Sequence, residues 1–197
     1  MAKGPSYSVP YRRRRERKTD FGKRRPLATS SDPRLVFRPS NENLLVQVVR
    51  SEIIGDYVMA HANSREVAKK YGWLGGSKNT SAAYLIGFLV GKRALKSGIE
   101  RVNLDLGIRT PTKGSRPFAT VKGAQDAGLE VHCEESVIPG TERIDGSSVG
   151  GFAKTVLEQP AKGEHRFSSL VKRGLKPDDM ADHFRGVKAK MEEEFKD

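Results

Sequence analysis

Arginine and lysine side chains concentrate in the stretch "YRRRRERKTDFGKRR", residues 11–25. Residues 1–25 hold ten Lys/Arg against two acids, a net charge of +8 out of +12 for all 197 residues. Each guanidinium can pair two N–H groups with phosphate oxygens, and a row of them can follow a nucleic-acid groove. This charge asymmetry predicts a polyanionic partner, either nucleic acid or an anionic membrane surface.

Two observations favour nucleic acid over a membrane. Membrane binding by a helix needs apolar residues between the basic ones, and residues 12–18 contain none. The longest mainly apolar run, 82–90, is about half the length that spans a bilayer, and no apolar stretch follows the arginines as in a secretory signal. A solvated tail without a partner and a nuclear-targeting signal remain alternatives for the same residues.

Residue types that could support catalysis are present but scattered. The four histidines are far apart in the sequence, and adjacent strand residues at 132–135 (His-Cys-Glu-Glu) would point to opposite faces, away from a common metal. The single cysteine, Cys133, excludes an internal disulfide and indicates an intracellular protein. Two catalytic arrangements come into question: Cys133 as a nucleophile with a distant histidine, against which stands an ordinary buried cysteine, and a pocket around Asp105 and His61. We predict no enzyme, no metal and no cofactor.

A second group of phosphate-binding residues lies beyond the basic stretch. In "TPTKGSR" (110–116), Lys113 and Arg116 flank Gly114-Ser115, whose backbone N–H groups would bind an anion at the start of the next helix. An ordinary strand-to-helix turn capped by Ser115 fits this loop equally well. Further polar residues are expected on an exposed sheet face that reaches RNA sugar and base edges: Arg34, Arg38, Ser40, Asn41 and Gln47.

These residues need a folded scaffold, which the hydrophobic pattern describes. Val- and Leu-rich runs predict an antiparallel three-strand meander over 34–40, 43–51 and 56–63. After a short helix at 65–70, a buried helix covers 82–96, with a cap at 79–81 and a stop at Gly98. Its Gly87 and Gly91 would let a sheet approach closely.

A β-α-β unit follows, with a strand at 101–107, a helix at 117–127 and an edge strand at 129–133. The fold class is therefore α/β, a mixed sheet with helices packed on it, a basic extended N-terminal arm and a C-terminal helix. We predict three parts: an arm at 1–30, a core domain at 31–135 and a C-terminal extension at 136–197.

The C-terminal extension divides into two parts. Residues 136–177 are expected to be mostly loop, with a helical turn near 152–157. In 177–196, apolar side chains recur three or four residues apart, which predicts an amphipathic helix that docks on an unidentified surface; they are Met180, Phe184, Val187, Met191 and Phe195.

Several segments carry a family resemblance: "KGPSYSVPYRRRRERKTDFGKRR", "PRLVFRPSN", "YGWLGG", "NTSAAYLIGFLVGKRALKSGIE" and "LDLGIRTPTKGSRPFATVKGAQDAGLEV". In this order they resemble the archaeal-type form of the universal large-subunit ribosomal protein that binds 5S ribosomal RNA, the L-eighteen family. The resemblance covers residues 3–132 and is thin over 136–197.

The resemblance implies a structural role in the cytoplasmic ribosome. The partners would be 5S rRNA, large-subunit rRNA and neighbouring large-subunit proteins, without a membrane. The implied RNA-binding residues are Arg12, Arg13, Arg14, Arg15, Arg17, Lys18, Lys23, Arg24, Arg25, Arg34, Arg38, Ser40, Asn41, Lys113, Ser115 and Arg116. Two departures stand out: Glu42 replaces a basic residue usual in the family, and 140–154 keeps only Arg143 of an Arg-rich turn.

Two other functions fit the basic arm. One is an RNA-processing or RNA-modifying enzyme that holds its substrate with the arm and has a pocket near Asp105 and His61. The other is a DNA-binding module that does not distinguish duplex DNA from RNA of similar charge. In every case we expect the arginine run to be unfolded when free, because it buries no apolar area to offset its ordering entropy.

Overall fold

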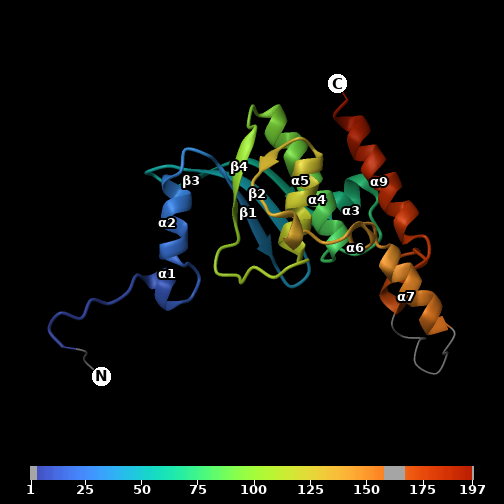
Figure 1. Cartoon of the computed structure of the whole chain (residues 1–197), viewed down its shortest axis with the longest axis horizontal. Helices are drawn as coiled ribbons and strands as arrows, with labels where there is room; N and C mark the ends of the chain where they lie inside the picture. The colour runs from blue at the N-terminus through green and yellow to red at the C-terminus, as the bar shows by residue number, and fades with distance from the viewer. Residues whose placement is uncertain (1–3, 158–166, 197) are drawn as a thin grey trace.

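A computed structural model describes residues 4–157 and 167–196. Its centre is a five-stranded mixed sheet in the order β3-β2-β1-β4-β5, with α4 packed against one face and α5 alongside it (Figure 1). The predicted fold class is confirmed. In the part of the chain described, no helix combines the length and the apolar character that crossing a membrane requires.

The sheet joins the predicted meander to the predicted β-α-β unit. β1 pairs antiparallel with β2, and β2 with β3, while β4 runs parallel to both β1 and β5. The strand bounds are β1 Arg34–Pro39, β2 Leu44–Ser51, β3 Asp56–Asn63, β4 Arg101–Asp105 and β5 Glu130–Val131. Val36 lies opposite both Gln47 of β2 and Asp105 of β4, so β1 is a central strand.

Alternation along β1 gives the sheet two different faces. Leu35 and Phe37 enter the hydrophobic core, whereas Arg34, Val36 and Arg38 point to the opposite face, because successive strand residues alternate in direction. Val36 is nevertheless buried, so chain outside the helical layer must cover part of this second face.

The helical layer is built around α4 (Thr80–Lys96), preceded by α3 (Ser64–Tyr71) and packed along α5 (Arg116–Asp126). The Asn79 side chain caps α4 by accepting a hydrogen bond from the Ala82 N–H at 2.8 Å. Gly98 follows the helix at φ 75°, a left-handed conformation that favours glycine. The predicted buried helix and both of its ends are confirmed.

The glycines of α4 serve a different contact from the one predicted. A Cβ on Gly87 would lie 2.1 Å from the Thr120 carbonyl oxygen, and one on Gly91 would lie 2.7 Å from the Ala127 Cβ. Thr120 and Ala127 belong to α5 and its C-cap, so the expectation that a sheet approaches here was wrong. A Cβ on Gly123 of α5 would likewise lie 2.1 Å from the Tyr84 carbonyl oxygen of α4. The two helices therefore touch backbone to backbone.

Replacing Gly87 with alanine should destabilise the protein by about 3 kcal/mol or more, because a methyl group cannot fit without separating α4 from α5. The matched control is Gly186→Ala in α9, where nothing lies within 4 Å of the new Cβ. That variant should gain about 0.5–1 kcal/mol from helix propensity. Urea unfolding measures both changes, and equal midpoints for the two variants would contradict the close contact.

The segment after β5 contains more helix than predicted. The 3₁₀ turn η1 (Glu135–Val137) leads to three helices: α6 (Thr141–Asp145), α7 (Ser147–Leu157) and α8 (Ser168–Val171). Ile144, Ala153 and Leu175 are each at most 6% exposed, so this segment contributes to the hydrophobic core. The expectation of mostly loop over 136–177 was wrong within its described residues, because a few widely spaced apolar side chains suffice to dock these short helices. Residues 158–166 lie outside the described residues.

The C-terminal helix α9 (Met180–Glu194) docks on the protein's own core, which the sequence left undecided. Met180, Phe184, Val187 and Met191 are all buried, as the periodicity predicted. At the far end, the Tyr71 hydroxyl donates to Glu194 Oε2 at 2.8 Å. Burial and this carboxylate raise the pKa of Tyr71 well above its ordinary value.

His183 connects α9 to the loop after α3. Its ring stacks on Trp73 with centroids 5.3 Å apart, and its Nε2 accepts a hydrogen bond from the Leu74 N–H at 3.0 Å. Burial, and then the charge of Lys190, lower the pKa of His183 below its ordinary value of 6.5. The neutral ring is the form that fits, because a protonated imidazole cannot accept the Leu74 hydrogen bond.

Acidification should therefore weaken the docking of α9. In the unfolded chain His183 is protonated near pH 6.5, whereas in the folded protein it is protonated only at lower pH. The contribution of neutral His183 to the free energy of unfolding is complete above pH 6.5, and it is lost as the pH falls to the lowered pKa of the folded state. His183→Gln keeps an acceptor but does not titrate, so its stability relative to the wild type should rise between about pH 7.5 and 5. Urea unfolding across this range gives the difference, and a constant difference would contradict the assignment.

Candidate nucleic-acid interface

Residues 12–29 of the N-terminal arm lie on the second face of the sheet (Figure 1). The arm contains two helices, α1 (Arg12–Arg15) and α2 (Phe21–Thr29), on the side of the sheet away from α4 and α5 (Figure 1). α2 contacts β2 and β4, which accounts for the burial of Val36. The Asp20 side chain caps α2 by accepting from Gly22 N at 3.0 Å. The sequence did not predict this helix, because it is polar, has no apolar stripe and contains Pro26.

α1 is a single turn that ends in a Schellman motif. The Lys18 N–H donates to the Arg13 carbonyl and the Arg17 N–H to the Arg14 carbonyl, at 2.9 and 3.1 Å. Arg17 occupies the left-handed position usually taken by glycine, at φ 50°. None of the α1 residues is buried, so the turn leaves the side chains of Arg12–Arg15 open to a partner.

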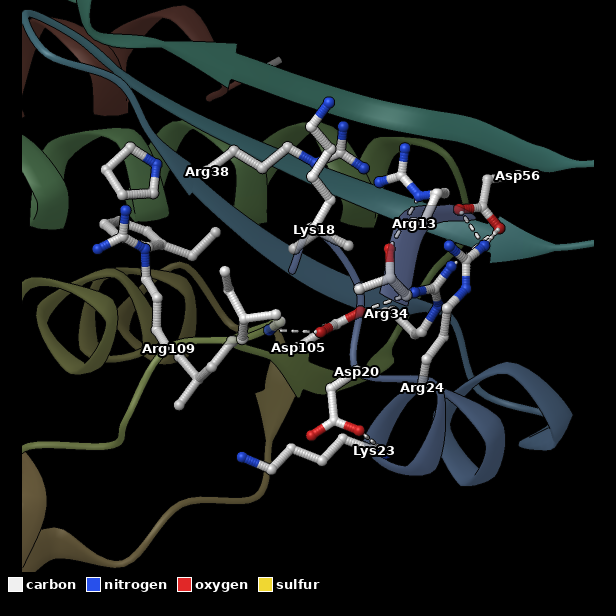
Figure 2. A pocket seen from close by; sticks show the side chains of 17 residues that line it. Arg13, Lys18, Asp20, Lys23, Arg24, Arg34, Arg38, Asp56, Asp105 and Arg109 are labelled. Atoms are coloured by element: carbon white, nitrogen blue, oxygen red, sulfur yellow. Dashed lines mark hydrogen bonds and ion pairs between the residues drawn. The ribbon is translucent and has the colours of Figure 1, made fainter. Parts of the chain in front are cut away.

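An ion-pair network fastens the arm to the sheet. Arg24 of α2 donates to both carboxylate oxygens of Asp56 at 3.0 and 2.9 Å (Figure 2). Arg34 of β1 donates from Nη1 to Asp105 Oδ2 at 2.6 Å, and its Nη2 lies 2.9 Å from Asp56 Oδ1. Asp56 therefore lies between an arm arginine and a sheet arginine and connects the two.

Arg34 is a structural residue in this arrangement. Its side chain is 4% exposed, and its charge is matched by Asp56 and Asp105. A phosphate group could reach it only if the arm left the sheet. The expectation that Arg34 lies on an exposed face was wrong, because the arm covers the start of β1 and two acids distant in the sequence neutralise the guanidinium.

A basic groove opens between the arm, β1 and the loop after β4. Its volume is about 350 Å³, and Figure 2 shows charged side chains from all three segments around it. Seven basic and three acidic residues line it, a net charge of +4; they are Arg13, Lys18, Lys23, Arg24, Arg34, Arg38 and Arg109, with Asp20, Asp56 and Asp105. Charges of one sign concentrated in a groove attract a polyanion.

Arg109 is a groove residue that sequence reasoning missed. It follows β4 in the 108–116 loop, is exposed and lies on the opposite side of the groove from the arm (Figure 2). Its position directly after the predicted strand at 101–107, in the same loop as Lys113 and Arg116, was a usable signal. Arg38 of β1 is exposed in this groove, as predicted.

The 110–116 loop differs from the predicted anion site. The Gly114 N–H donates to the Val137 carbonyl at 2.8 Å and the Ser115 N–H to the Thr112 carbonyl at 3.2 Å. Because both donors are occupied within the protein, the prediction that they are open to an anion was wrong. Ser115 is the N-cap residue of α5, but its side chain makes no capping hydrogen bond.

Three loops meet beside the groove through Lys78. Arg116 donates from Nη1 to the Lys78 carbonyl at 3.1 Å, and Lys78 donates from Nζ to the Asn41 carbonyl at 3.1 Å. The Ser40 hydroxyl closes its own turn, accepting from Asn43 N at 2.9 Å. Lys113 is exposed. These loops form a second basic surface, to which Lys78 is an unpredicted contributor.

The other arm residues remain accessible. Arg12, Arg14, Arg15, Arg17 and Arg25 are exposed. Arg13 donates from Nε to Thr19 Oγ1 at 2.8 Å, which turns it toward the groove. With Lys18 and Lys23 exposed as well, the structure brings much of the predicted arm set to one side of the sheet.

The catalytic alternative has no geometric support. Asp105 is in β4 and His61 in β3, with β2 and β1 between them, so they lie about 14 Å apart at ordinary strand spacing. Asp105 is also committed to Arg34. Burial raises the pKa of the Cys133 thiol, which disfavours the reactive thiolate. Within residues 4–157 and 167–196, no group of three or more potential ligands is placed to hold a metal ion.

Comparisons with known proteins identify the family. The family described as "Ribosomal large subunit proteins 60S L5, and 50S L18" matches residues 5–102. The large ribosomal subunit protein uL18 of Caldivirga maquilingensis is 47% identical over 99% of this chain and 95% of its own length. The uL18 proteins of Aeropyrum pernix and Staphylothermus marinus are 45% and 44% identical over all of this chain and over 92% and 98% of theirs.

This chain belongs to the uL18 family. It is of the archaeal type, as the L-eighteen resemblance implied, and it is a structural protein of the large ribosomal subunit rather than an enzyme. The uL18 relatives align through residues 136–197 as well, where the motif resemblance was thin. As a ribosomal protein, it has ribosomal RNA and other ribosomal proteins as its partners.

Proposed function

We propose that this uL18 protein binds 5S rRNA and helps attach it to the large-subunit rRNA of a cytoplasmic ribosome. The observation that carries the proposal is the arm, which has a net charge of +8 over residues 1–25. Arm residues from Arg13 to Arg24 line a groove of net charge +4. Phosphate contacts of this kind supply much of the affinity for nucleic acid.

The arm and the sheet have different roles in this proposal. The exposed arginines of α1 bind phosphates, and Lys23, Arg38 and Arg109 extend the contact into the groove. Arg24 holds the arm in place through Asp56 and reaches RNA only with its remaining exposed surface. Because phosphate contacts carry no sequence information, selection of 5S rRNA must come from the shape that the arm and the folded domain present together.

The loop surface supplies a second set of contacts. Lys78, Lys113 and Arg116 lie on loops that also hold Ser40 and Asn41, so one RNA segment could follow them beyond the groove. Glu42 stands where a basic residue is usual in the family, and it forms an ion pair with Arg65 at 3.8 Å. Its negative charge lowers the net positive charge of the loop surface. We therefore place the stronger contacts on the arm.

Competitive filter binding tests the proposal. Purified protein is bound to labelled 5S rRNA, with unlabelled 5S rRNA, transfer RNA and duplex DNA as competitors, at several salt concentrations. A preference for 5S rRNA of about two orders of magnitude or more at moderate salt supports a shape-specific interface. Equal competition by all three would show that only the arginine charge binds, and would overturn the assignment to 5S rRNA.

A further inference from the structure

The turn between β2 and β3 exposes a cluster of large apolar side chains. We call residues 52–58 the hairpin tip. Within it, Ile53 and Ile54 are 108% and 101% exposed, Tyr57 is 62% exposed and Val58 is 41% exposed. β3 is an edge strand, so the tip stands at the border of the sheet and belongs neither to the hydrophobic core nor to the basic groove.

The fold itself gives no reason for isoleucines at this turn. Backbone hydrogen bonds close it, from Glu52 N to the Gly55 carbonyl at 3.0 Å and from Gly55 N to the Glu52 carbonyl at 3.2 Å. Polar residues and glycine ordinarily occupy such turns, because they tolerate water and the required dihedrals. Two adjacent isoleucines with wholly exposed side chains therefore indicate a surface that is covered in the assembled state.

The tip is also held in place before any partner arrives. Ser51 donates from its hydroxyl to Asp56 Oδ1 at 3.3 Å, and Asp56 is fixed by Arg24 and Arg34. Pairing of β2 with β3 continues to Ser51 and Asp56, directly beside the turn. A surface fixed in this way loses little conformational entropy on binding.

The side chains of the tip favour a protein over RNA as the covering partner. Lysine and arginine make up 36 of the 197 residues, yet the stretch 51–64 contains neither and includes Glu52 and Asp56. The nearest basic side chains are Arg50, opposite Tyr57 on β2, and Arg24, which is paired with Asp56, so Glu52 is the one charged residue beside the two isoleucines and it would repel phosphate. Tyr57 has an aromatic face, but Ile53 and Ile54, the most exposed side chains of the tip, offer neither a ring for base stacking nor a donor for phosphate.

We propose that the hairpin tip docks into a second protein of the large subunit, in an apolar socket bordered by basic side chains. Ile53 and Ile54 enter the socket, and Glu52 pairs with a lysine or arginine at its rim. Buried apolar anchors with a polar rim are the usual arrangement of protein interfaces. This inference rests on family membership and on the tip, not on binding to 5S rRNA.

Site-specific photo-cross-linking tests the partner class. A benzophenone amino acid at position 54, in protein assembled into large subunits, should cross-link to another ribosomal protein. The control position is Val171 on α8, an exposed apolar residue far from the tip in sequence. Cross-linking of position 54 to rRNA alone, to a second copy of this chain, or to nothing would overturn the proposal.

The variant Ile53→Ser/Ile54→Ser provides a functional test. Free protein should keep its thermal unfolding midpoint and bind 5S rRNA within about twofold of the wild type, because the tip is outside the core and the groove. In competition with the wild type for incorporation into large subunits, the variant should be about tenfold less represented. Val171→Ser should compete normally. Equal incorporation of the double variant would overturn the proposal, whatever the result for 5S rRNA.

Discussion

Replacing Arg12, Arg13, Arg14 and Arg15 with glutamine is expected to lower affinity for 5S rRNA by about two to three orders of magnitude near 0.15 M salt. These side chains are exposed on a one-turn helix that buries nothing, so the substitutions leave the folded domain intact. Each phosphate contact that releases a counterion contributes about 0.7–0.9 to the salt slope. The slope of log K against log salt should therefore become shallower by about three, as measured by filter binding between 50 and 300 mM salt.

The control for this variant changes the same net charge elsewhere. Lys172, Arg185, Lys190 and Lys196 are exposed on the C-terminal side of the molecule and outside the groove. Their combined replacement by glutamine should alter affinity only slightly, through the general field of the protein. If the two quadruple variants show the same salt slope, overall charge rather than the arm determines binding, and the proposed interface is wrong.

Asp105→Ala is expected to cost about 3 kcal/mol or more of unfolding free energy, because it removes one of the two acids that neutralise buried Arg34. The Asp105 side chain also accepts from the Gly107 N–H at 2.8 Å, so the loop after β4 loses an anchor. Nε and Nη2 of Arg34 are already buried without a hydrogen bond in the described structure, so loss of the Asp105 carboxylate would add Nη1 to them. Urea unfolding measures the loss.

A double variant separates a structural role for Arg34 from an RNA contact. In Arg34→Met/Asp105→Ala the buried charge is gone, while Asp56 keeps its pair with Arg24, so most of the lost stability should return. If Arg34 is structural, this variant binds 5S rRNA within about twofold of the wild type under conditions where both are folded. A loss of affinity equal to that from removing one α1 arginine would instead make Arg34 an RNA contact.

The sequence predicted the sheet, the two long core helices and α9, because each has a clear period of apolar residues. It missed α2, which is polar and is held by Asp20 and by ion pairs rather than by an apolar stripe. It also missed α6, whose one buried side chain is Ile144, since a single apolar residue shows no period. Local patterns reveal elements that bury a face, and these two helices bury almost none.

The arm arginines were predictable from composition, whereas the role of each basic residue depended on contacts distant in sequence. Arg34 and Arg38 occupy the same face of β1, yet one is buried and the other exposed, because the arm covers only the start of the strand. Asp105 lies 71 residues from Arg34, and no spacing rule connects them. Gly87 and Gly91 showed that something approaches α4, but not that α5 does.

The parallel pairing of β1 with β4 means that the sheet cannot be completed until long after β1 has been synthesised. Arg34 leaves the synthesising ribosome well before Asp105, and at about 5–20 residues per second the 71 residues between them take about 4–14 seconds to make. During that interval the nascent chain can form the β1-β2-β3 meander, whose contacts are local, but not the pairing of β1 with β4. β4, which joins the meander to the β-α-β unit, also brings the second carboxylate that pairs with Arg34, so addition of β4 to the sheet and full neutralisation of that buried charge occur in the same step.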